Sequence, residues 1–194
     1  MVSPNRIASH TKPLAANSQI KGRVFHFQAA GNILLGNCYI NSFNGVMGGG
    51  LLRLNADGSV DTGFNPPRAN GPISRVIVAE DGIYLAAFLH YGGETNDRLF
   101  RLDPNTGALD LAFPPARLEH FGAISLRIAV SGNQIVSNNT QLMGNVFGLS
   151  KFNSDGSYDD PFRPEVSRYG TIKLADIHQD KMLVAGDFIR MNGM

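Results

Sequence analysis

The sequence predicts an all-β fold made of about four copies of one repeat, and three observations support that prediction. Glycine is frequent, with 22 residues, and together with 10 prolines it makes a composition that favours turns over helices. Pairs of short apolar runs, each joined by a Gly/Asx-type turn, occur four times along the chain. A longer motif, with an aspartate and a phenylalanine at fixed places, follows the first three pairs.

The glycine, the aspartate and the phenylalanine of the longer motif recur at a step of 49 residues. The motif reads LLRLNADGSVDTGFNP from Leu51, LFRLDPNTGALDLAFPP from Leu99 and LSKFNSDGSYDDPFRP from Leu149. A fixed period of about 20–50 residues indicates a repeat architecture in which each unit buries its apolar face against the next. The aligned columns are the glycines Gly58, Gly107 and Gly156, the aspartates Asp61, Asp110 and Asp159, and the phenylalanines Phe64, Phe113 and Phe162.

Each repeat begins with a predicted β-hairpin. The paired runs are 24–27 with 33–36, 75–78 with 83–88, 126–130 with 135–137, and 172–177 with 182–188. The run that opens the longer motif alternates apolar residues with a basic one, which suits a strand with one buried face. Three or four strands within 49 residues fit a β-propeller blade, whereas the coils of a β-solenoid, the other candidate, are shorter.

The repeats predict a single β-propeller domain over residues 1–194. Its divisions are an N-terminal segment 1–21, repeats at 22–69, 70–119 and 120–169, and a partial fourth repeat at 170–194. The fourth copy has no third strand and no Asp-Gly turn, and an exposed strand edge favours aggregation. We expect residues 1–21 to supply the missing strand and to close a small four-bladed propeller. The alternative is an open arc that another copy or another protein completes.

The first and third copies of the motif, and the run MLVAGDF at 182–188, resemble the delta-60 repeat family of bacterial and phage-associated proteins. Units of that family pair a hairpin of the form DGK-I-hydrophobic-GGDF with the motif RLN-x-DGS-x-D-x-x-F. The resemblance covers about residues 22–194, although DPNTGA replaces N-x-D-G-S in the second copy and the third copy has no recognisable GGDF. The resemblance implies a β-propeller fold and brings no catalytic residues.

Charge and cysteine content exclude several classes of function. The net charge is +1 and no basic run is interleaved with aromatics, so we expect neither a nucleic acid nor an anionic membrane as partner. Cys38 is the single cysteine, which rules out an intrachain disulfide and a cysteine-based zinc site, and we interpret it as a buried hydrophobe. The N-terminal segment lacks the apolar core of a signal peptide, and no run of 18 apolar residues predicts a membrane span.

The turn of the first copy places oxygen-bearing side chains at alternate positions, namely Asn55, Asp57, Ser59 and Asp61. Calcium takes about six to eight oxygen ligands, but the glycine here is misplaced for an EF-hand loop. We interpret the cluster as a hairpin turn in which Asp57 caps backbone N–H groups, Gly58 adopts positive φ and Asp61 pairs nearby. The corresponding residues of the third copy are Asp155, Gly156 and Asp159.

Basic residues recur with the aspartates, as Arg53 with Asp61, Arg101 with Asp110, and Lys151 with Asp159. We expect exposed ion pairs worth about 0–1 kcal/mol each, and the alternative is a basic ring around a propeller channel that binds an anion. No G-x-S-x-G motif marks a nucleophile, so the sequence predicts no enzyme, cofactor or metal site. The histidines share no repeat column and lack metal-ligand spacing; they are His10, His26, His90, His120 and His178.

The predicted function is that of a non-enzymatic structural or interaction scaffold. Its partners would be other protein subunits, bound at variable loops expected at 41–50, 90–98 and 138–148. By analogy, such a scaffold suits a larger assembly such as a phage virion or tail, which would also be its location. The alternative is a lectin-like propeller that binds glycans through tyrosines, since the chain has no tryptophan. The candidate tyrosines are Tyr39, Tyr91 and Tyr169, whereas the recurrent phenylalanines are expected to wedge between neighbouring blades.

Overall fold

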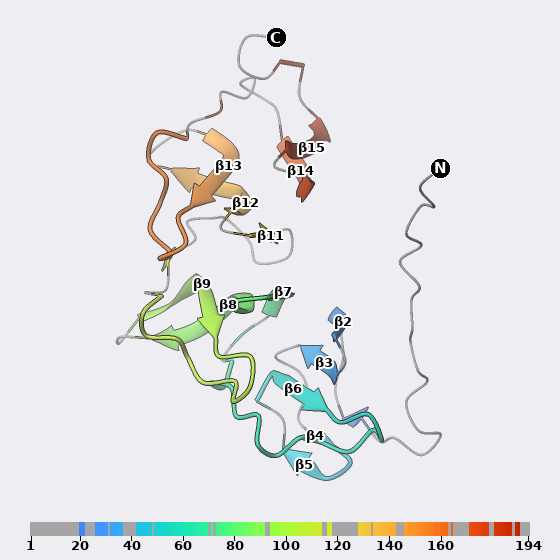
Figure 1. Ribbon diagram of the computed structural model, residues 1–194. Helices are drawn as coiled ribbons and strands as arrows, with labels where there is room; N and C mark the ends of the chain where they lie inside the picture. The colour runs from blue at the N-terminus through green and yellow to red at the C-terminus, as the bar shows by residue number, and fades with distance from the viewer. Residues whose placement is uncertain are drawn as a thin grey trace, which may run out of the picture.

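The chain is all-β in the computed structural model (Figure 1). The structure describes residues 20–21, 26–30, 32–36, 42–47, 49–69, 71, 73–91, 94–113, 116–117, 128–132, 134–142, 146–162, 164, 171–178, 181–187 and 189–190. Within these ranges the regular structure consists of strands, which form small antiparallel sheets. The expected all-β class is therefore confirmed, and the four expected hairpins are present.

The first repeat forms a three-stranded sheet in the order β2–β3–β6. Its strands are β2 (His26–Ala30), β3 (Asn32–Gly36) and β6 (Leu51–Leu54). β2 and β3 make the hairpin, with Ala30 opposite Asn32, and β6 returns antiparallel along β3. The order of strands in the sheet thus follows the order of strands in the chain, which is a meander.

A separate small sheet accompanies the first repeat, in the order β1–β4–β5. Its strands are β1 (Ile20–Lys21), β4 (Ser42–Phe43) and β5 (Val46–Met47). The turn between β4 and β5 has Asn44 at φ 48° and Gly45 at φ 83°, so both central residues are left-handed, as a tight two-residue hairpin requires. Ile20 lies opposite Phe43. Residues 1–19, which make up nearly all of the expected closing segment 1–21, lie outside the described residues.

The later repeats follow the same plan. The second has the order β10–β9–β8–β7, the third β11–β12–β13, and the fourth, in its described part, is the hairpin β14–β15. The second repeat comprises β7 (Ile73–Ala79), β8 (Gly82–Tyr91), β9 (Glu94–Leu102) and β10 (Ala116–Arg117). The other strands are β11 (Ile128–Ser131), β12 (Gln134–Leu142), β13 (Val146–Phe152), β14 (Thr171–His178) and β15 (Lys181–Asp187).

The variable loops expected at 90–98 and 138–148 are largely strand, so that expectation is wrong. β8 ends at Tyr91 opposite Glu94, the first residue of β9, and the two strands form one long hairpin arm. β12 and β13 pair in the same way as far as Leu142 and Val146. The polar composition of these segments gives no alternating apolar pattern from which a strand can be predicted. The strands form nevertheless, because the hydrogen bonds of a β-ladder join backbone groups and do not require apolar side chains.

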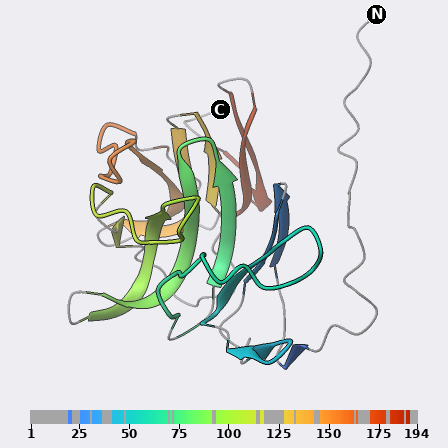
Figure 2. The ribbon, with the colours of Figure 1, turned by 60° about the horizontal axis from the view of Figure 1, so that its bottom comes forward.

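Consecutive repeats lie side by side in chain order. Their first strands contact one another in succession, β2 with β7, β7 with β11, and β11 with β14 (Figure 1). Figure 2 shows the sheets standing next to each other, with the β8–β9 arm projecting beyond its own sheet. Sheets whose first strands adjoin in this way are arranged like the blades of a propeller.

The hydrophobic core lies between the repeats. On β8, Ile83 and Leu85 pack in a cluster shared with the first repeat, whereas Tyr84 packs in a cluster shared with the third. A strand alternates its side chains in this way, so the middle sheets are buried on both faces and each repeat supports the next. The clusters join Phe64 to Phe100, Phe113 to Ile128, and Val136 to Ile172.

Truncation of Phe113 tests this packing. The side chain is 0% exposed and meets Tyr84 edge to face, with 5.7 Å between ring centroids, so its removal leaves a cavity between the second and third repeats. We expect Phe113→Ala to lower the free energy of unfolding in urea by about 3–5 kcal/mol. The control Leu111→Ala shortens a side chain that is 76% exposed and should change it by less than about 0.5 kcal/mol. A loss below about 1 kcal/mol for Phe113→Ala would contradict burial at this interface.

Candidate functional site

The longer motif forms a tight turn closed by a glycine N–H in each of its three copies, and the turn of the second copy is one residue longer than the other two. In the first, the Gly58 N–H donates to the Asn55 carbonyl at 2.9 Å, and the Asn55 N–H donates to the Ser59 carbonyl at 2.8 Å. Gly58, Gly107 and Gly156 have φ of 87°, 75° and 85°, a left-handed conformation that glycine adopts without steric cost. Backbone geometry therefore accounts for the glycine column.

A carboxylate caps each turn. Asp57 Oδ1 accepts hydrogen bonds from the backbone N–H of Ser59 at 2.9 Å and from its hydroxyl at 2.7 Å, and the third copy repeats this pair. In the second copy the cap is Asp103, whose Oδ1 accepts from the Thr106 N–H at 2.7 Å. The repeat columns missed Asp103, because the turn of that copy is one residue longer. The hydrogen bonds from Thr106 hold the pKa of Asp103 below its ordinary value, and those from Ser157 do the same for the pKa of Asp155.

The second aspartate of each motif pairs with the basic residue of the preceding strand. The distances from a side-chain nitrogen to Oδ2 are 2.8 Å for Arg53–Asp61, 2.7 Å for Arg101–Asp110 and 3.0 Å for Lys151–Asp159. The hydrogen bond from Arg53, supported by one from the Gly63 N–H, holds the pKa of Asp61 below its ordinary value. The three ion pairs therefore join the same two positions of the motif at similar distances.

The two arginines also reach the following repeat. Arg53 donates from Nη1 to the Pro104 carbonyl and from Nη2 to the Asn105 carbonyl, both in the turn of the second copy. Arg101 donates from Nη1 to the Ser154 carbonyl, in the turn of the third copy, at 3.2 Å. A guanidinium can hold its own aspartate and the next turn together because it carries five N–H donors in a planar fork. We call this arrangement, formed by Arg53 and Arg101 with these partners, the arginine clasp.

A phenylalanine ring lies beneath each clasp. The guanidinium carbon is 4.4 Å from the ring centroid of Phe64 in the first clasp and 4.9 Å from that of Phe113 in the second, within the range of a cation–π contact. The Phe64 ring also covers Gly107 of the next repeat, where an added Cβ would lie 2.9 Å from the ring. Gly107 is thus required by the ring as well as by its φ. At Gly58 an added Cβ would meet nothing within 4 Å.

The third copy departs from this pattern. Lys151 replaces the arginine, and its side chain is 31% exposed, compared with 15% for Arg53 and 16% for Arg101. Phe162 is half-buried and packs against the cluster shared with the fourth repeat, whereas Phe113 is fully buried. The described part of the fourth repeat contains no turn of this type that would cover the two side chains.

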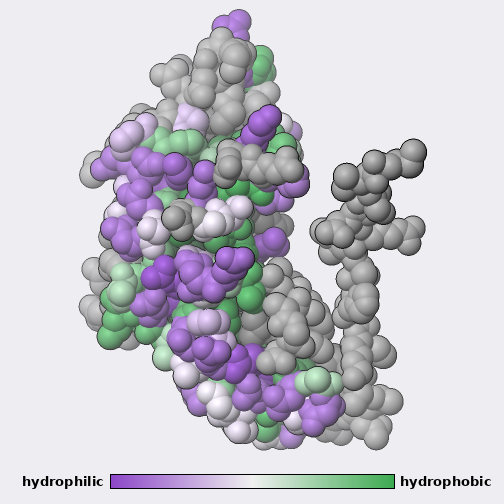
Figure 3. All heavy atoms as spheres, viewed as in Figure 1, coloured by the Kyte–Doolittle hydropathy of each residue, from purple (hydrophilic) through white to green (hydrophobic). Residues whose placement is uncertain are grey.

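Polar side chains gather over the turns that follow β6, β9 and β13 (Figure 3). They include the caps and ion pairs described above, which bond to one another and to the backbone. The turn and clasp residues therefore contribute to this polar surface, and their carboxylates form hydrogen bonds and ion pairs that stabilise the fold.

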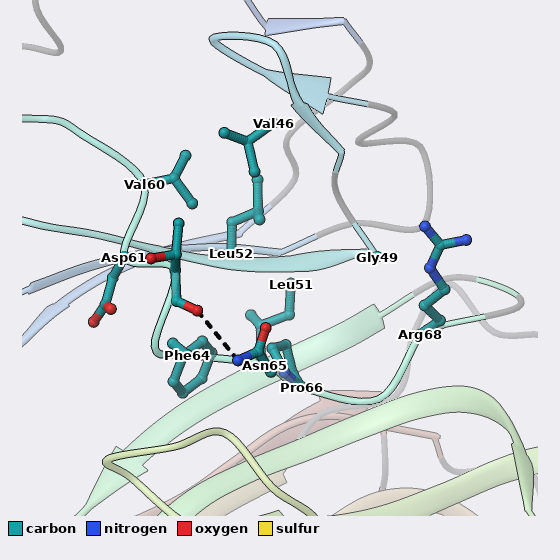
Figure 4. A pocket seen from close by; sticks show the side chains of 11 residues that line it. Val46, Gly49, Leu51, Leu52, Val60, Asp61, Phe64, Asn65, Pro66 and Arg68 are labelled. Carbon is teal, nitrogen blue, oxygen red and sulfur yellow. Dashed lines mark hydrogen bonds between the residues drawn. The ribbon is translucent and has the colours of Figure 1, made fainter.

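A pocket of about 220 Å³ surrounds the end of β6 (Figure 4). Val46, Leu52 and Val60 lie together on one side of the strand. Asp61 belongs to the lining, but its carboxylate is held by Arg53, and Arg68 adds a single further charge. The lining is mostly apolar and offers no acid–base pair for chemistry.

The other candidates from the sequence are not brought together in the described part of the chain. His26, His90 and His178 lie on β2, β8 and β14, in three different repeats, and Tyr91 ends β8. The described residues contain no group of three or more His, Cys, Asp or Glu side chains suited to a metal ion, and no helix long and apolar enough to span a bilayer. The candidates outside the described residues are His10, Cys38, Tyr39, His120 and Tyr169.

Two buried polar side chains of the described residues, Ser137 and Asn138, lie outside the motif, both on β12. Asn138 on β12 is 1% exposed, and its Nδ2 donates to the carbonyl of Ile172 on β14 at 3.0 Å. It therefore joins the third repeat to the fourth, and the third repeat is the one in which Lys151 replaces the arginine of the clasp. Two polar residues in succession, Ser137 and Asn138, directly after the apolar pair Ile135–Val136 are the sequence signal that could have revealed it.

Comparison with known proteins supports a propeller-like repeat. Residues 31–64 match a protein-family model described as "Domain of unknown function (DUF5122) beta-propeller". The matched segment spans β3, β6 and the first turn as far as Phe64. No curated protein and no solved structure matches the chain. The match supports a family of propeller-like repeats, and it does not single out the delta-60 repeats.

Removal of the guanidinium tests the arginine clasp. We expect Arg53→Met to lower the free energy of unfolding in urea by about 1–3 kcal/mol, because it leaves Asp61 and two turn carbonyls without their donor. Arg53→Lys should recover less than half of the loss, since one ammonium lacks the fork that reaches all three oxygens. Arg68→Met, at an exposed arginine, is the matched control and should cost less than about 0.5 kcal/mol. Full recovery by Arg53→Lys would show that charge alone suffices and that the fork plays no part.

The turn carboxylates predict a loss of stability in acid. The folded pKa values of Asp61, Asp103 and Asp155 are lowered, so their contribution is present above the unfolded value of about 3.9 and disappears as the pH falls through the folded values. We expect the melting temperature to decrease as the pH is lowered below about pH 4. This decrease should be less steep in the Asp61→Asn variant. Circular-dichroism melts between neutral pH and about pH 2.5 measure this, and identical acid slopes for both proteins would contradict the role of Asp61.

Proposed function

We propose that this chain is a non-enzymatic scaffold that binds other protein subunits, with its four hairpins as the cores of four propeller blades. The observation that carries the proposal is the arginine clasp. The recurrent charged side chains would be the first candidates for chemistry. Arg53 and Arg101 bond to the aspartate of their own repeat and to the turn of the next, and Lys151 pairs with Asp159 of its own repeat. The recurrent charged residues therefore hold the repeats together. A rigid array of repeats is a common support for protein binding.

The hairpin arms are the features that favour a protein partner. The β8–β9 arm extends beyond its sheet (Figure 2), and its ladder continues to Tyr91 and Glu94. The edges of such an arm present backbone N–H and C=O groups that an extended segment of a partner can pair with. These arms take the place of the variable loops expected at 90–98 and 138–148.

The fourth blade needs a further strand under this proposal. Residues 1–21 are one source, as expected from the sequence, and another chain is the other source. Either source of the strand gives the same proposed arrangement of four blades. The setting that we propose, a larger assembly such as a phage virion or tail, is supported by the resemblance to delta-60 repeats alone.

Selection from a displayed library of random peptides tests the proposed function. We expect the immobilised full chain to enrich peptides that bind with dissociation constants of about 1–100 µM in fluorescence anisotropy, a range typical of short segments without a preordered structure. The urea-unfolded chain serves as the control for non-specific adsorption. Absence of enriched peptides, together with saturable binding on a glycan array, would overturn the scaffold in favour of the lectin-like alternative.

A further inference from the structure

We infer that the pocket beside β6 is a docking site for the C-terminal residue of another protein, whose apolar side chain enters the pocket while its carboxylate binds Arg68. The inference rests on the proposed scaffold function, which supplies a protein subunit as the source of that residue. It adds the place of binding and the chemistry that recognises the partner. We call the site the β6 pocket, and its lining includes Val46, Leu52, Val60 and Arg68 (Figure 4).

The β6 pocket forms where the first repeat departs from the plan of the next two. In those repeats the second and third strands continue as one long hairpin, in the pairs β8–β9 and β12–β13. In the first repeat the segment between β3 and β6 contains β4 and β5, which belong to the separate sheet β1–β4–β5. Val46 of β5 lies beside Leu52 and Val60, and the three side chains form an apolar wall (Figure 4).

The size of the β6 pocket suits one side chain. Its volume is about 220 Å³, which is below the range of about 300–1,000 Å³ that is typical of sites for drug-sized ligands. An apolar cavity of about 150 Å³ is large enough for benzene, so a leucine or phenylalanine side chain is of the right size. Leu51 and Leu52 in the lining are 1% and 6% exposed, whereas Val46 is 39% exposed. An apolar group that enters the pocket would cover Val46.

The charges of the lining favour an anion. Asp61 is already engaged through both of its oxygens, because Oδ2 accepts from Arg53 Nε at 2.8 Å and Oδ1 accepts from the Gly63 N–H at 2.9 Å. Arg68 is exposed, and no ion pair joins it to another residue in the described part of the chain. The positive charge of Arg68 is therefore available to a ligand, and a guanidinium can bind a carboxylate through two parallel hydrogen bonds.

The backbone around Arg68 is fixed at two points. The Asn65 N–H donates to the Thr106 carbonyl in the turn of the second copy at 2.7 Å, and the Ala69 N–H donates to the Gly49 carbonyl at 2.7 Å. A Cβ added to Gly49 would lie 3.0 Å from Cγ of Arg68, so the glycine leaves room for the arginine stem (Figure 4). The stem of Arg68 is thus positioned beside the pocket before a ligand arrives, which limits the conformational entropy lost on binding.

A C-terminal residue combines the two features that the pocket selects. Its carboxylate and its side chain are attached to the same Cα, so an apolar side chain in the pocket brings a carboxylate to the rim. Within an extended segment, an apolar residue and the acidic residue next to it point to opposite faces. An acidic side chain in the pocket would place its charge among Leu51, Leu52 and Val60, where a charge without a partner is costly. Capture of a terminal carboxylate is a recurring mode of peptide recognition.

Titration with matched peptides tests the site. The probe is a fluorescein-labelled peptide Gly-Ser-Gly-Ser-Leu with a free C-terminal carboxylate, titrated with the full chain in fluorescence anisotropy. We expect saturable binding with a dissociation constant of about 10 µM to 1 mM. The same peptide with a C-terminal amide should bind about tenfold more weakly, because it offers no charge to Arg68. The free acid that ends in serine should also bind about tenfold more weakly, because its side chain does not fill the pocket. Absence of binding by the leucine peptide and by its phenylalanine counterpart, or equal binding of acid and amide, would overturn the inference.

Variants of the full chain locate the bound carboxylate. Arg68→Met should weaken binding of the free acid about tenfold and leave binding of the amide unchanged, because the arginine acts on the carboxylate. Val46→Asp, which places a negative charge in the wall of the pocket, should also weaken binding of the free acid about tenfold. Arg190→Met is the matched control, since it makes the same exchange at an exposed arginine that follows β15, and it should bind like the unchanged chain. Melting curves establish that each variant is folded. An equal effect of Arg68→Met on the acid and the amide would contradict the contact between Arg68 and the carboxylate.

Further measurements separate the possible occupants. Octanoate that binds about tenfold more tightly than the leucine peptide would assign the pocket to a free fatty acid and overturn the inference. Self-association of the full chain in analytical ultracentrifugation that Arg68→Met abolishes would identify a second copy as the occupant, with the same consequence. Failure of the leucine and phenylalanine peptides, while peptides from the random library still bind, would overturn this site and leave the scaffold function in place, so the two proposals fail separately.

Discussion

The arginine clasp is the interaction on which the arrangement of the repeats depends. Apolar clusters between the sheets supply most of the favourable free energy, but hydrophobic contact has no direction and would allow neighbouring sheets to slide. A guanidinium that binds its own aspartate and the carbonyls of the next turn fixes both the distance and the orientation of two repeats. The ring of Phe64 beneath the guanidinium meets the turn glycine of the next repeat, so polar and apolar contacts define the same offset.

This use of charge explains why a chain with recurrent carboxylates and basic groups shows no reactive constellation in its described part. Lowered aspartate pKa values often accompany functional sites, but here each has a local structural cause. Asp61 is held by Arg53, and Asp103 and Asp155 are held by the turns that they cap. The same groups would have to leave the turns in order to bind a ligand, which would loosen the joint between two repeats.

The sequence was sufficient for the repeat and its local elements, because glycine turns, alternating strands and hairpins are encoded within a few residues. The match of Ile83 to Leu102 and of Ile135 to Phe152 follows from those short patterns. The polar contacts between repeats could not be predicted from the sequence, since Arg53 binds carbonyls 51 and 52 residues away and a backbone acceptor has no side-chain signature. The long arms were missed for a related reason: polar strands such as Glu94–Leu102 depend on backbone pairing that composition does not record. The importance of Asn138 likewise depends on a carbonyl in the neighbouring repeat.

Among the described residues, the β14–β15 hairpin packs on one side, against the third repeat, and this has a consequence for how the molecule opens. Repeats that contact only their neighbours behave as a linear array, in which an inner unit is held from both sides and a terminal unit from one. Met182 and Val184 of β15 face the third repeat, whereas Leu183 between them is exposed. Amide hydrogens of this hairpin should therefore exchange through local opening while the β7–β9 sheet stays closed.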